Sequence, residues 1–173
     1  MHILLHKIQN KYLENNSIAY CKTPIGTAKL IANASGLQSV KILDKDYQAF
    51  PKEIPKNLKK AVKQLTDYFY NGLTNFQLKL NPMGTKFQLK VWRLSQQIPY
   101  GKTISYLELS QRYGEVEAIR AIAHANAKNP LWIIIPCHRV IGKYGDLTGY
   151  AGGLWRKKYL LELEQGIHQT KLF

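Results

Sequence analysis

The first part of the chain alternates between short apolar runs and turn residues, a pattern typical of short β-strands. Three runs rich in β-branched and apolar residues are separated by Pro24, Gly26 and Gly36, and each predicts a strand. They cover residues 18–23, 27–34 and 37–43. Apolar side chains at helical spacing then predict a helix that ends at Gly72. They are Leu58, Val62, Leu65 and Phe69. Residues 75–80 are expected to add a last strand, and nothing in this half indicates a second active site.

After Asn81-Pro82 the apolar pattern changes to the period of helices. Thr85 and Gln88 form a capping box at the start of an apolar helical face, which continues until Pro99. That face consists of Phe87, Val91, Leu94 and Ile98. We therefore expect a domain boundary near residue 81.

Two shorter helices are predicted next, joined by a turn that contains Gly114. Ser105 and Glu108 form a capping box for the first helix, and the second is rich in alanine, covers about 117–127 and has Arg120 near its start. Two helices joined in this way form the helix-turn-helix signature, whose second helix enters a groove of DNA. Plain packing of a helical hairpin explains the same pattern equally well, although the basic charge and the small alanine face favour DNA.

The last quarter of the chain leads to a cysteine and ends in a helix. A wholly apolar run over 131–135 predicts a buried extended segment that reaches Cys137. Glycine-rich turns are predicted over 142–146 and 149–153, and a final helix over 154–165.

The formal net charge of the chain is +14, which favours a polyanionic partner, nucleic acid before an anionic membrane surface. Every arginine follows residue 81, and the planar guanidinium suits phosphates and bases, so specific nucleic-acid chemistry is expected in the second half. No apolar run is long enough to span a bilayer, and the first residues contain too short an apolar core for a signal peptide. We therefore expect a cytoplasmic protein that does not enter the membrane.

The two cysteines, Cys21 and Cys137, are expected to remain reduced thiols in that compartment. No Cys-x-x-Cys or His-x-x-x-His spacing indicates a metal ion, so no metal site is predicted. Pro136 denies Cys137 a regular helix or a central strand. The sequence thus predicts a thiol at a corner of the chain, where it can meet a substrate.

Cys137 also has the neighbours that a nucleophilic thiol needs, although a free cysteine is more often a small buried apolar residue. A thiol with a pKa of about 8.5 is only a few per cent ionised at neutral pH, so a base must activate it. His138 offers that base directly or through water, and Arg139 adds positive potential that favours the thiolate. A third group should orient the imidazole, and Glu164 in the final helix is the predicted carboxylate.

Several blocks of the second half follow one another in a specific order. They read Gly84-Thr-x-Phe-Gln-x-x-Val-Trp92, Ile98-Pro-Tyr-Gly-x-Thr-x-Ser-Tyr106, Arg120-Ala121, Asn129-Pro130, Pro136-Cys-His-Arg-Val140 and Gly149-Tyr-x-Gly-Gly-Leu154. In this order the blocks resemble the O6-alkylguanine-DNA alkyltransferases. The resemblance runs from Gly84 to Glu164, and the first half resembles, more faintly, the ribonuclease-H-like first domain of that family.

The resemblance implies a catalytic role for each of five positions. Cys137 matches the alkyl-accepting thiol, and His138 the base that takes its proton through a water. Glu164 matches the carboxylate that orients His138. Asn129 matches a hinge residue between the recognition helix and the active-site segment, and Tyr106 matches the residue that turns the 3′ phosphate and hydrogen-bonds the flipped guanine.

The resemblance also implies a binding pocket for the alkylated guanine. The carbonyl of Val140 would read the guanine amino group, the backbone N–H of Ala151 would donate to the exocyclic oxygen, and Tyr150 would form a wall. Trp132 stands where the family often has proline, and it is expected at the rim of the pocket.

Contacts to DNA are implied for the start of the third helix. Arg120 matches a finger that enters the base stack, and Ala121, Arg139 and Tyr106 are also expected at the DNA. This chain differs from the family at 122–124, where Ile-Ala-His replaces a common Val-Gly pair, so the packing of this helix on DNA is expected to differ.

Together these observations predict an α+β protein with two domains. Residues 1–81 would form a small ribonuclease-H-like sheet-and-helix scaffold, and residues 82–173 a mainly helical domain with a winged helix-turn-helix. The expected function is direct-reversal DNA repair: Cys137 takes the alkyl group irreversibly from O6-alkylguanine in double-stranded DNA, once per molecule. A monomer without cofactor or metal is expected.

Two alternatives remain at this stage. A non-catalytic module that binds alkylation damage would have no use for an acceptor thiol. A helix-turn-helix regulator would need a dimer and a palindromic site, and no dimerisation helix is evident in the sequence.

Overall fold

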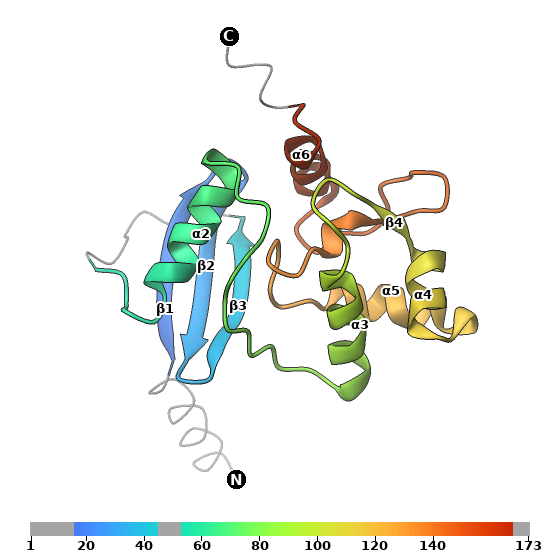
Figure 1. The fold of residues 1–173 in the computed structure, drawn as a ribbon, viewed down its shortest axis with the longest axis horizontal. Helices are drawn as coiled ribbons and strands as arrows, with labels where there is room; N and C mark the ends of the chain where they lie inside the picture. The colour runs from blue at the N-terminus through green and yellow to red at the C-terminus, as the bar shows by residue number, and fades with distance from the viewer. Residues whose placement is uncertain (1–15, 45–52, 168–173) are drawn as a thin grey trace. The chain divides into compact units, whose positions relative to one another are not determined.

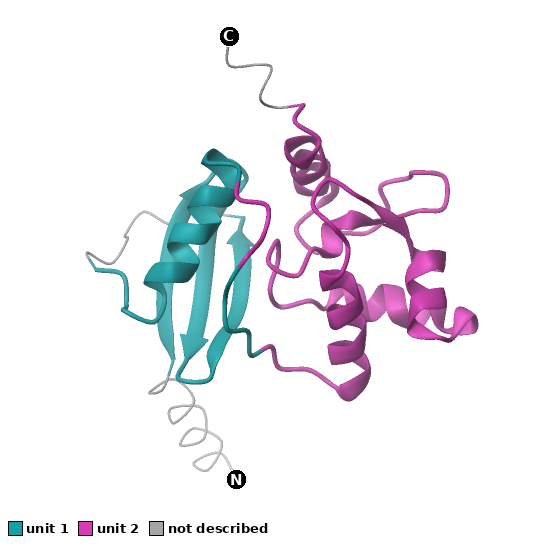
Figure 2. Ribbon diagram, in the orientation of Figure 1, with its two compact units in different colours: residues 1–72, 77–81 teal, residues 73–76, 82–173 magenta. Residues whose placement is uncertain are grey.

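The computed structural model describes residues 16–44 and 53–167 (Figure 1). The chain divides into two compact units (Figure 2), and each is described by itself. The first comprises residues 1–72 and 77–81, and the second comprises residues 73–76 and 82–173. The predicted α+β class is confirmed, because strands make up most of the first unit and helices most of the second.

The first unit contains a three-stranded antiparallel sheet in the order β1-β2-β3. The strands are β1 (Ser17–Thr23), β2 (Gly26–Asn33) and β3 (Gly36–Leu43). Ala28, Leu30 and Ala32 alternate along β2 and are buried, as expected where one face of a sheet meets a core. The three predicted strands are confirmed.

Helix α2 (Lys59–Tyr70) packs on this sheet (Figure 1). Leu58 and Leu65 are fully buried, and the chain turns away after the helix at Gly72, whose φ is 69°. The predicted helix and its end are therefore confirmed.

The predicted strand over 75–80 is wrong. Only Leu80 forms a bridge to β3, through Leu37, and Lys79 accepts a hydrogen bond from the Leu37 N–H. Further back, the Gln77 N–H donates to the side chain of Gln64 on α2 instead of to a strand. The segment therefore follows the sheet edge for one bridge and does not extend it.

The second unit begins with helix α3 (Lys86–Gln96), whose predicted capping box is present in full. The Thr85 hydroxyl accepts from the Gln88 N–H, and the Gln88 side chain accepts from the Thr85 N–H. Val91 and Trp92 are buried, and the Trp92 indole N–H donates to the Ala125 carbonyl at 2.8 Å.

Helices α4 (Tyr106–Tyr113) and α5 (Ile119–Ala127) form the predicted helix-turn-helix. Gly114 ends α4 with φ 95°, a left-handed conformation that glycine adopts without strain. Half of the second capping box is formed: Ser105 caps the Glu108 N–H, but the Glu108 carboxylate accepts from Arg112.

The unit is completed by a small parallel sheet and the last helix. Strands β4 (Ile104–Ser105) and β5 (Val140–Ile141) pair in parallel and bring the start of α4 beside the segment that follows Cys137. Helix α6 (Leu154–Glu164) confirms the predicted final helix.

The segment over 131–135 is buried as predicted, but the expected extended conformation is wrong. The Ile135 N–H donates to the Leu131 carbonyl at 2.8 Å, and Trp132 bridges to Ile135, so the chain turns back on itself. Ile133 has φ 72° in this turn. Apolar composition alone cannot separate a buried strand from a buried turn.

Candidate active site

Cys137 begins a short 3₁₀ turn, Cys137–Arg139, that directly follows Pro136. The residue is buried, with 5% of its surface exposed, and lies in neither an α-helix nor a strand. The turn before it is strained, because the left-handed conformation of the β-branched Ile133 costs on the order of 1–3 kcal/mol. Strain of this size persists only where the surroundings fix the chain firmly.

Two asparagines of α5 and its end fix this segment. The Asn129 amide donates to the Cys137 Sγ at 3.2 Å and to the Ile135 carbonyl at 2.8 Å, and its oxygen accepts from the Leu131 N–H. The Asn126 amide donates to the Cys137 carbonyl at 3.3 Å. The inner face of the helix-turn-helix thus holds the thiol by direct hydrogen bonds.

His138 and Glu164 lie together in the interior. The His138 Nε2 is 2.8 Å from Glu164 Oε1, and both side chains are almost completely buried. The same carboxylate accepts from Arg139 through Nε at 2.8 Å and Nη2 at 3.0 Å, and from the Gly101 N–H at 3.1 Å. Four donors therefore converge on the Glu164 carboxylate.

These donors keep Glu164 ionised. Burial by itself raises the pKa of Glu164, but the hydrogen bonds from His138 and Arg139 and the charge of Arg139 outweigh burial and lower the pKa to about 2. Burial lowers the pKa of His138, more than Glu164 raises it, so His138 is neutral at pH 7. Since His138 carries no charge, the cation that balances Glu164 is Arg139.

The ionised carboxylate also determines the tautomer of His138. A carboxylate only accepts hydrogen bonds, so Nε2 carries the ring proton and Nδ1 holds the lone pair. Nδ1 is buried and has no hydrogen-bond partner among the described residues. The arrangement presents a neutral base one residue away from the thiol.

The thiol itself is protonated at rest. Burial raises the pKa of Cys137 to about 11, and the Asn129 hydrogen bond and the Lys157 charge lower it only in part. Transfer of its proton to a base is therefore required before the sulfur can act as a nucleophile.

The contacts of Arg139 disagree with the roles predicted for it at the DNA and at the thiol. Its guanidinium is buried, forks onto Glu164 and donates to the Ile98 carbonyl at 2.6 Å. The group is thereby unavailable to a DNA phosphate, and its charge balances Glu164 instead of favouring the Cys137 thiolate.

Tyr106 and the predicted pocket residues lie around the same segment. Burial raises the pKa of Tyr106, and Asn126 of α5 and Thr148 of the loop that follows β5 lie close enough to its hydroxyl to offset part of that rise. The Val140 carbonyl lies in the buried strand β5, and the Ala151 residue is exposed.

Trp132 and Tyr150 pack together with ring centroids 5.6 Å apart. A side chain at Gly152 would collide with both rings, at 2.8 Å from each, so only glycine fits beneath this aromatic pair. The Tyr150 hydroxyl is buried, and no described residue accepts or donates a hydrogen bond to it.

Lys157 was not identified from the sequence, yet it lies at the centre of this region. Its side chain is fully buried on α6, and its ammonium group donates to the Val140 carbonyl at 2.7 Å and the Thr148 carbonyl at 2.8 Å. One signal could have revealed it: Lys157 is three residues before the apolar Leu160 and seven before Glu164, so all three share one helical face. A lysine on an apolar face is unusual.

The outer face of α5 is exposed. Arg120 and Ala121 lie on it, and Arg120, His124 and Lys128 follow at intervals of four residues, which places these basic side chains on one side of the helix. The opposite side, with Ile122 and Asn126, is buried.

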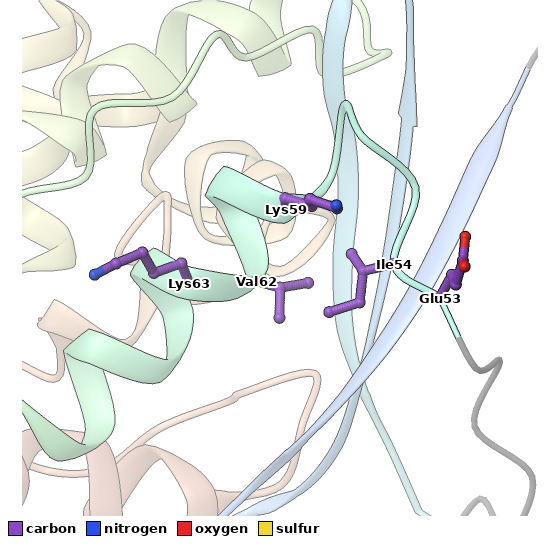
Figure 3. Close-up of a pocket in the computed structure, with 5 residues that line it drawn as sticks. All are labelled: Glu53, Ile54, Lys59, Val62 and Lys63. Carbon is purple, nitrogen blue, oxygen red and sulfur yellow. The ribbon is translucent and has the colours of Figure 1, made fainter.

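A hollow in the first unit is lined by the start of α2 and the residues before it (Figure 3). Its lining residues are Glu53, Ile54, Lys59, Val62 and Lys63. None of these is a cysteine or a histidine, and the charged ends of Glu53 and Lys63 lie at opposite sides of the view, away from each other (Figure 3). Across residues 16–44 and 53–167, no group of three potential metal ligands occurs, and no helix is long and apolar enough to cross a membrane.

Comparisons with known proteins match both units. The model of the 6-O-methylguanine DNA methyltransferase DNA-binding domain matches residues 86–166, and that of the ribonuclease-like domain of the same enzyme matches residues 17–82. The first of these matches includes all five positions that are predicted to be catalytic.

Individual relatives agree over most of the chain. The methylated-DNA–protein-cysteine methyltransferase of Methanosarcina barkeri is 45% identical over 148 residues, which cover 83% of this chain and 94% of that protein. The protein of the same name from Mycolicibacterium paratuberculosis is 44% identical over 146 residues, covering 83% of this chain and 88% of that protein. A crystal structure of Mycobacterium tuberculosis OGT in complex with DNA matches with a TM-score of 0.78 at 42% identity, covering 86% of this chain and 92% of that chain.

Proposed function

The chain belongs to the 6-O-methylguanine DNA methyltransferase family, and we propose that it repairs O6-alkylguanine in double-stranded DNA by moving the alkyl group to its own Cys137. The observation that carries this assignment of the acceptor is the buried Cys137 thiol, held by Asn129 beside a neutral His138 whose Nδ1 has no described partner. No cofactor is part of the proposed reaction.

The first step is activation of the thiol. His138 Nδ1 takes the proton of Cys137 Sγ, with a water molecule as the bridge between them. The imidazolium that results is stabilised by Glu164, which already accepts the hydrogen bond from Nε2. Arg139 keeps this carboxylate ionised throughout.

The second step is the transfer. The thiolate attacks the alkyl carbon from the side opposite the exocyclic oxygen, the S–C bond forms, and the C–O bond breaks. The electron pair of that bond stays on the guanine. The proton that His138 took from Cys137 then neutralises the guanine, and His138 returns to its neutral form. The thioether has no good leaving group, and no second nucleophile of the site removes the alkyl group. Each molecule therefore reacts once.

The base must leave the duplex to reach a buried thiol. We propose that Arg120, exposed near the start of α5, fills the gap in the base stack, and that Ala121 allows the helix to approach the DNA closely. Tyr106 turns the neighbouring phosphate and hydrogen-bonds the flipped guanine.

Inside the pocket, the backbone reads the guanine. The Val140 carbonyl accepts from its amino group, a role that its second lone pair allows while Lys157 occupies the first. The Ala151 N–H donates to the exocyclic oxygen, and the rings of Tyr150 and Trp132 form the wall.

We further propose that residues 1–81 act as a scaffold domain and that residues 82–173 bind DNA and accept the alkyl group. The protein acts as a monomer, because a single lesion requires a single acceptor. Because its proposed substrate is chromosomal DNA, the protein is proposed to work in the cytoplasm, in contact with that DNA.

The decisive experiment mixes the protein with duplex DNA that contains O6-methylguanine and examines the products by peptide mass spectrometry. One methyl group is expected on the peptide that contains Cys137, with one guanine restored per protein molecule. Binding without methyl transfer would indicate a damage-binding module. Repeated turnover, or methyl on Cys21, would contradict the proposed acceptor.

A further inference from the structure

Lys157 is a buried cation without a carboxylate partner among the residues that the structure describes. Its ammonium group instead donates to three carbonyl oxygens, those of Val140 at 2.7 Å, Thr148 at 2.8 Å and Gly149 at 3.5 Å. Burial of a charge is costly unless an opposite charge offsets it. The position adds to the cost, because the first turn of a helix, here α6, disfavours a positive charge.

The other charges near the thiol compensate one another. Glu164 is matched by Arg139, which forks onto it, and His138 between them is neutral. Arg156, also buried on α6, donates to the Gly152 carbonyl and lies over the Trp155 ring at 4.6 Å, and it is not among the groups that shift the pKa of Cys137. Lys157 is therefore the cation that acts on the thiol without a matching carboxylate among the described residues.

The remaining groups that face the thiol carry no charge. They are the Asn129 and Asn126 amides of α5 and its end, the Tyr106 phenol of α4 and the Tyr150 phenol of the loop before α6. Burial raises the pKa of both phenols, so they are neutral at pH 7. The interior around Cys137 therefore holds one uncompensated positive charge when the thiol is protonated.

We propose that Lys157 is a positioning residue for the transfer, whose buried charge prepares this interior for one negative charge, first on the Cys137 sulfur and then on the departing guanine. Lys157 lies where both charges appear, because it binds the Val140 carbonyl just beyond the Cys137 turn and its Nζ is 5.8 Å from the centre of the Tyr106 ring. It takes the role that the sequence suggested for Arg139. The part that concerns guanine rests on the proposed function, whereas the part that concerns the sulfur does not.

Burial lowers the pKa of Lys157 to about 8, so its ammonium group is still the main form at pH 7. The test is therefore the rate of Cys137 alkylation by iodoacetamide at pH 7, which needs neither DNA nor guanine. The rate is followed on the peptide that contains Cys137, so that Cys21 does not contribute. Lys157→Gln removes the charge but keeps N–H donors for Val140 and Thr148, Lys157→Arg keeps the charge, and Lys157→Met removes both. Lys158→Gln is the matched control, because that neighbour on α6 is exposed.

We expect Lys157→Gln and Lys157→Met to slow alkylation at pH 7 by roughly tenfold, because a rise of one unit in the pKa of a thiol is a tenfold loss of thiolate at that pH. Lys157→Arg and Lys158→Gln should leave the rate unchanged. A purely structural role would spare Lys157→Gln and affect Lys157→Met, and that outcome would overturn the proposal, as would four unchanged rates.

Thermal melting of each variant keeps the test independent of folding. If Lys157→Met does not fold, the pair of Lys157→Gln and Lys157→Arg still separates charge from hydrogen bonding. A wild type that fails to take methyl from DNA while its alkylation rate at pH 7 depends on Lys157 would refute the proposed function and leave the part of this inference that concerns the sulfur intact.

Discussion

The two cysteines of the chain differ in their surroundings far more than in their acidity. Burial raises the pKa of Cys21 and of Cys137 alike, to about 11. Cys21 lies in β1, where burial is the whole of the effect. Cys137 is buried more deeply, but Asn129 and Lys157 pull its pKa down and His138 stands next to it. A nucleophilic cysteine is therefore distinguished by the groups that stabilise its thiolate, because burial alone only raises the pKa of a thiol and lowers its reactivity.

The same contrast holds between the two units. Among the described residues of the first unit, Thr27 is the one buried polar side chain. The second unit buries Ser95, Ser110, Asn126, Asn129, His138, Arg139, Arg156, Lys157 and Glu164. Desolvated charge is expensive, so its concentration around one thiol marks the part of the molecule where chemistry takes place.

The largest effect should come from removing each of the two thiols in turn. We expect Cys137→Ala to abolish methyl transfer completely and Cys21→Ala to leave its rate unchanged, measured as methyl moved from labelled duplex DNA to protein. Both variants should bind alkylated duplex with wild-type affinity, because the predicted contacts come from α5. A loss of DNA affinity in Cys137→Ala would show that the thiol also supports the binding surface.

Removing the charge of Glu164 should cost the second unit much of its stability. Glu164→Gln leaves the Arg139 guanidinium buried without its anion, and breaking a buried ion pair in this way costs about 3–5 kcal/mol. Urea unfolding measures the difference. Glu108→Gln in the same unit is the control, since its exposed ion pair with Arg112 is worth at most about 1 kcal/mol.

Acid should destabilise the wild type through two buried groups, Glu164 and His138. The pKa of Glu164 falls from 4.5 to about 2 on folding, so its contribution of about 3 kcal/mol is present above pH 4.5 and is lost as the pH falls towards 2. The folded state also lowers the pKa of His138, so protonation of the unfolded chain begins to oppose folding below about pH 6.5. Urea unfolding at several pH values should show this decline in the wild type. Glu164→Gln should lack the part below pH 4.5, and an equal slope in both proteins would contradict the assignment.

The sequence predicted the elements better than it predicted the turns and the buried charges. The three strands and the helices have strong periodicity and clear end signals such as Gly72 and Gly114, and these were confirmed. The segment 131–135 was misjudged because five apolar residues fit a strand and a tight turn equally well, and only tertiary packing forces Ile133 into its left-handed conformation. Glu164 was predicted as the partner of His138, and the structure places it there.

Arg139 and Lys157 show why the partner of a charged residue is harder to predict from sequence than a helix or a strand. Both are basic residues near Cys137 in the fold, but a sequence does not reveal which cation meets a carboxylate. Adjacency along the chain favoured Arg139 as the cation that acts on the thiol. In the fold, however, Arg139 pairs with Glu164, and Lys157 of α6 binds the Val140 carbonyl just beyond the Cys137 turn. Contacts between distant residues decide such assignments, and spacing alone does not contain them.

A smaller effect should separate the Cys137 region from the exposed face of α5. We expect Arg120→Ala to slow repair of duplex DNA roughly tenfold more than reaction with free O6-benzylguanine. Flipping a base out of the duplex costs a few kcal/mol of stacking and pairing, and the arginine side chain offsets part of that cost. The free base needs no flipping and reports only the pocket and thiol. The measurement is the ratio of the two second-order rates. Equal losses on both substrates would place Arg120 in the pocket or the fold.

The smallest effect concerns Lys128, at the end of the exposed face of α5. Binding to undamaged duplex should weaken steeply with salt, and each phosphate neutralised adds about −0.9 to the slope of log affinity against log salt concentration. Lys128 is exposed one helical turn beyond His124, on the side of α5 opposite to the buried Asn126. We therefore expect Lys128→Met to make the slope shallower by about 0.9 and to leave the reaction with free O6-benzylguanine unchanged. Lys60→Met is the matched control, because Lys60 is an exposed lysine on α2 of the first unit and should not alter the slope. If both variants change the slope equally, the positive charge acts over the whole protein surface, and the contrast between the two units does not extend to DNA binding.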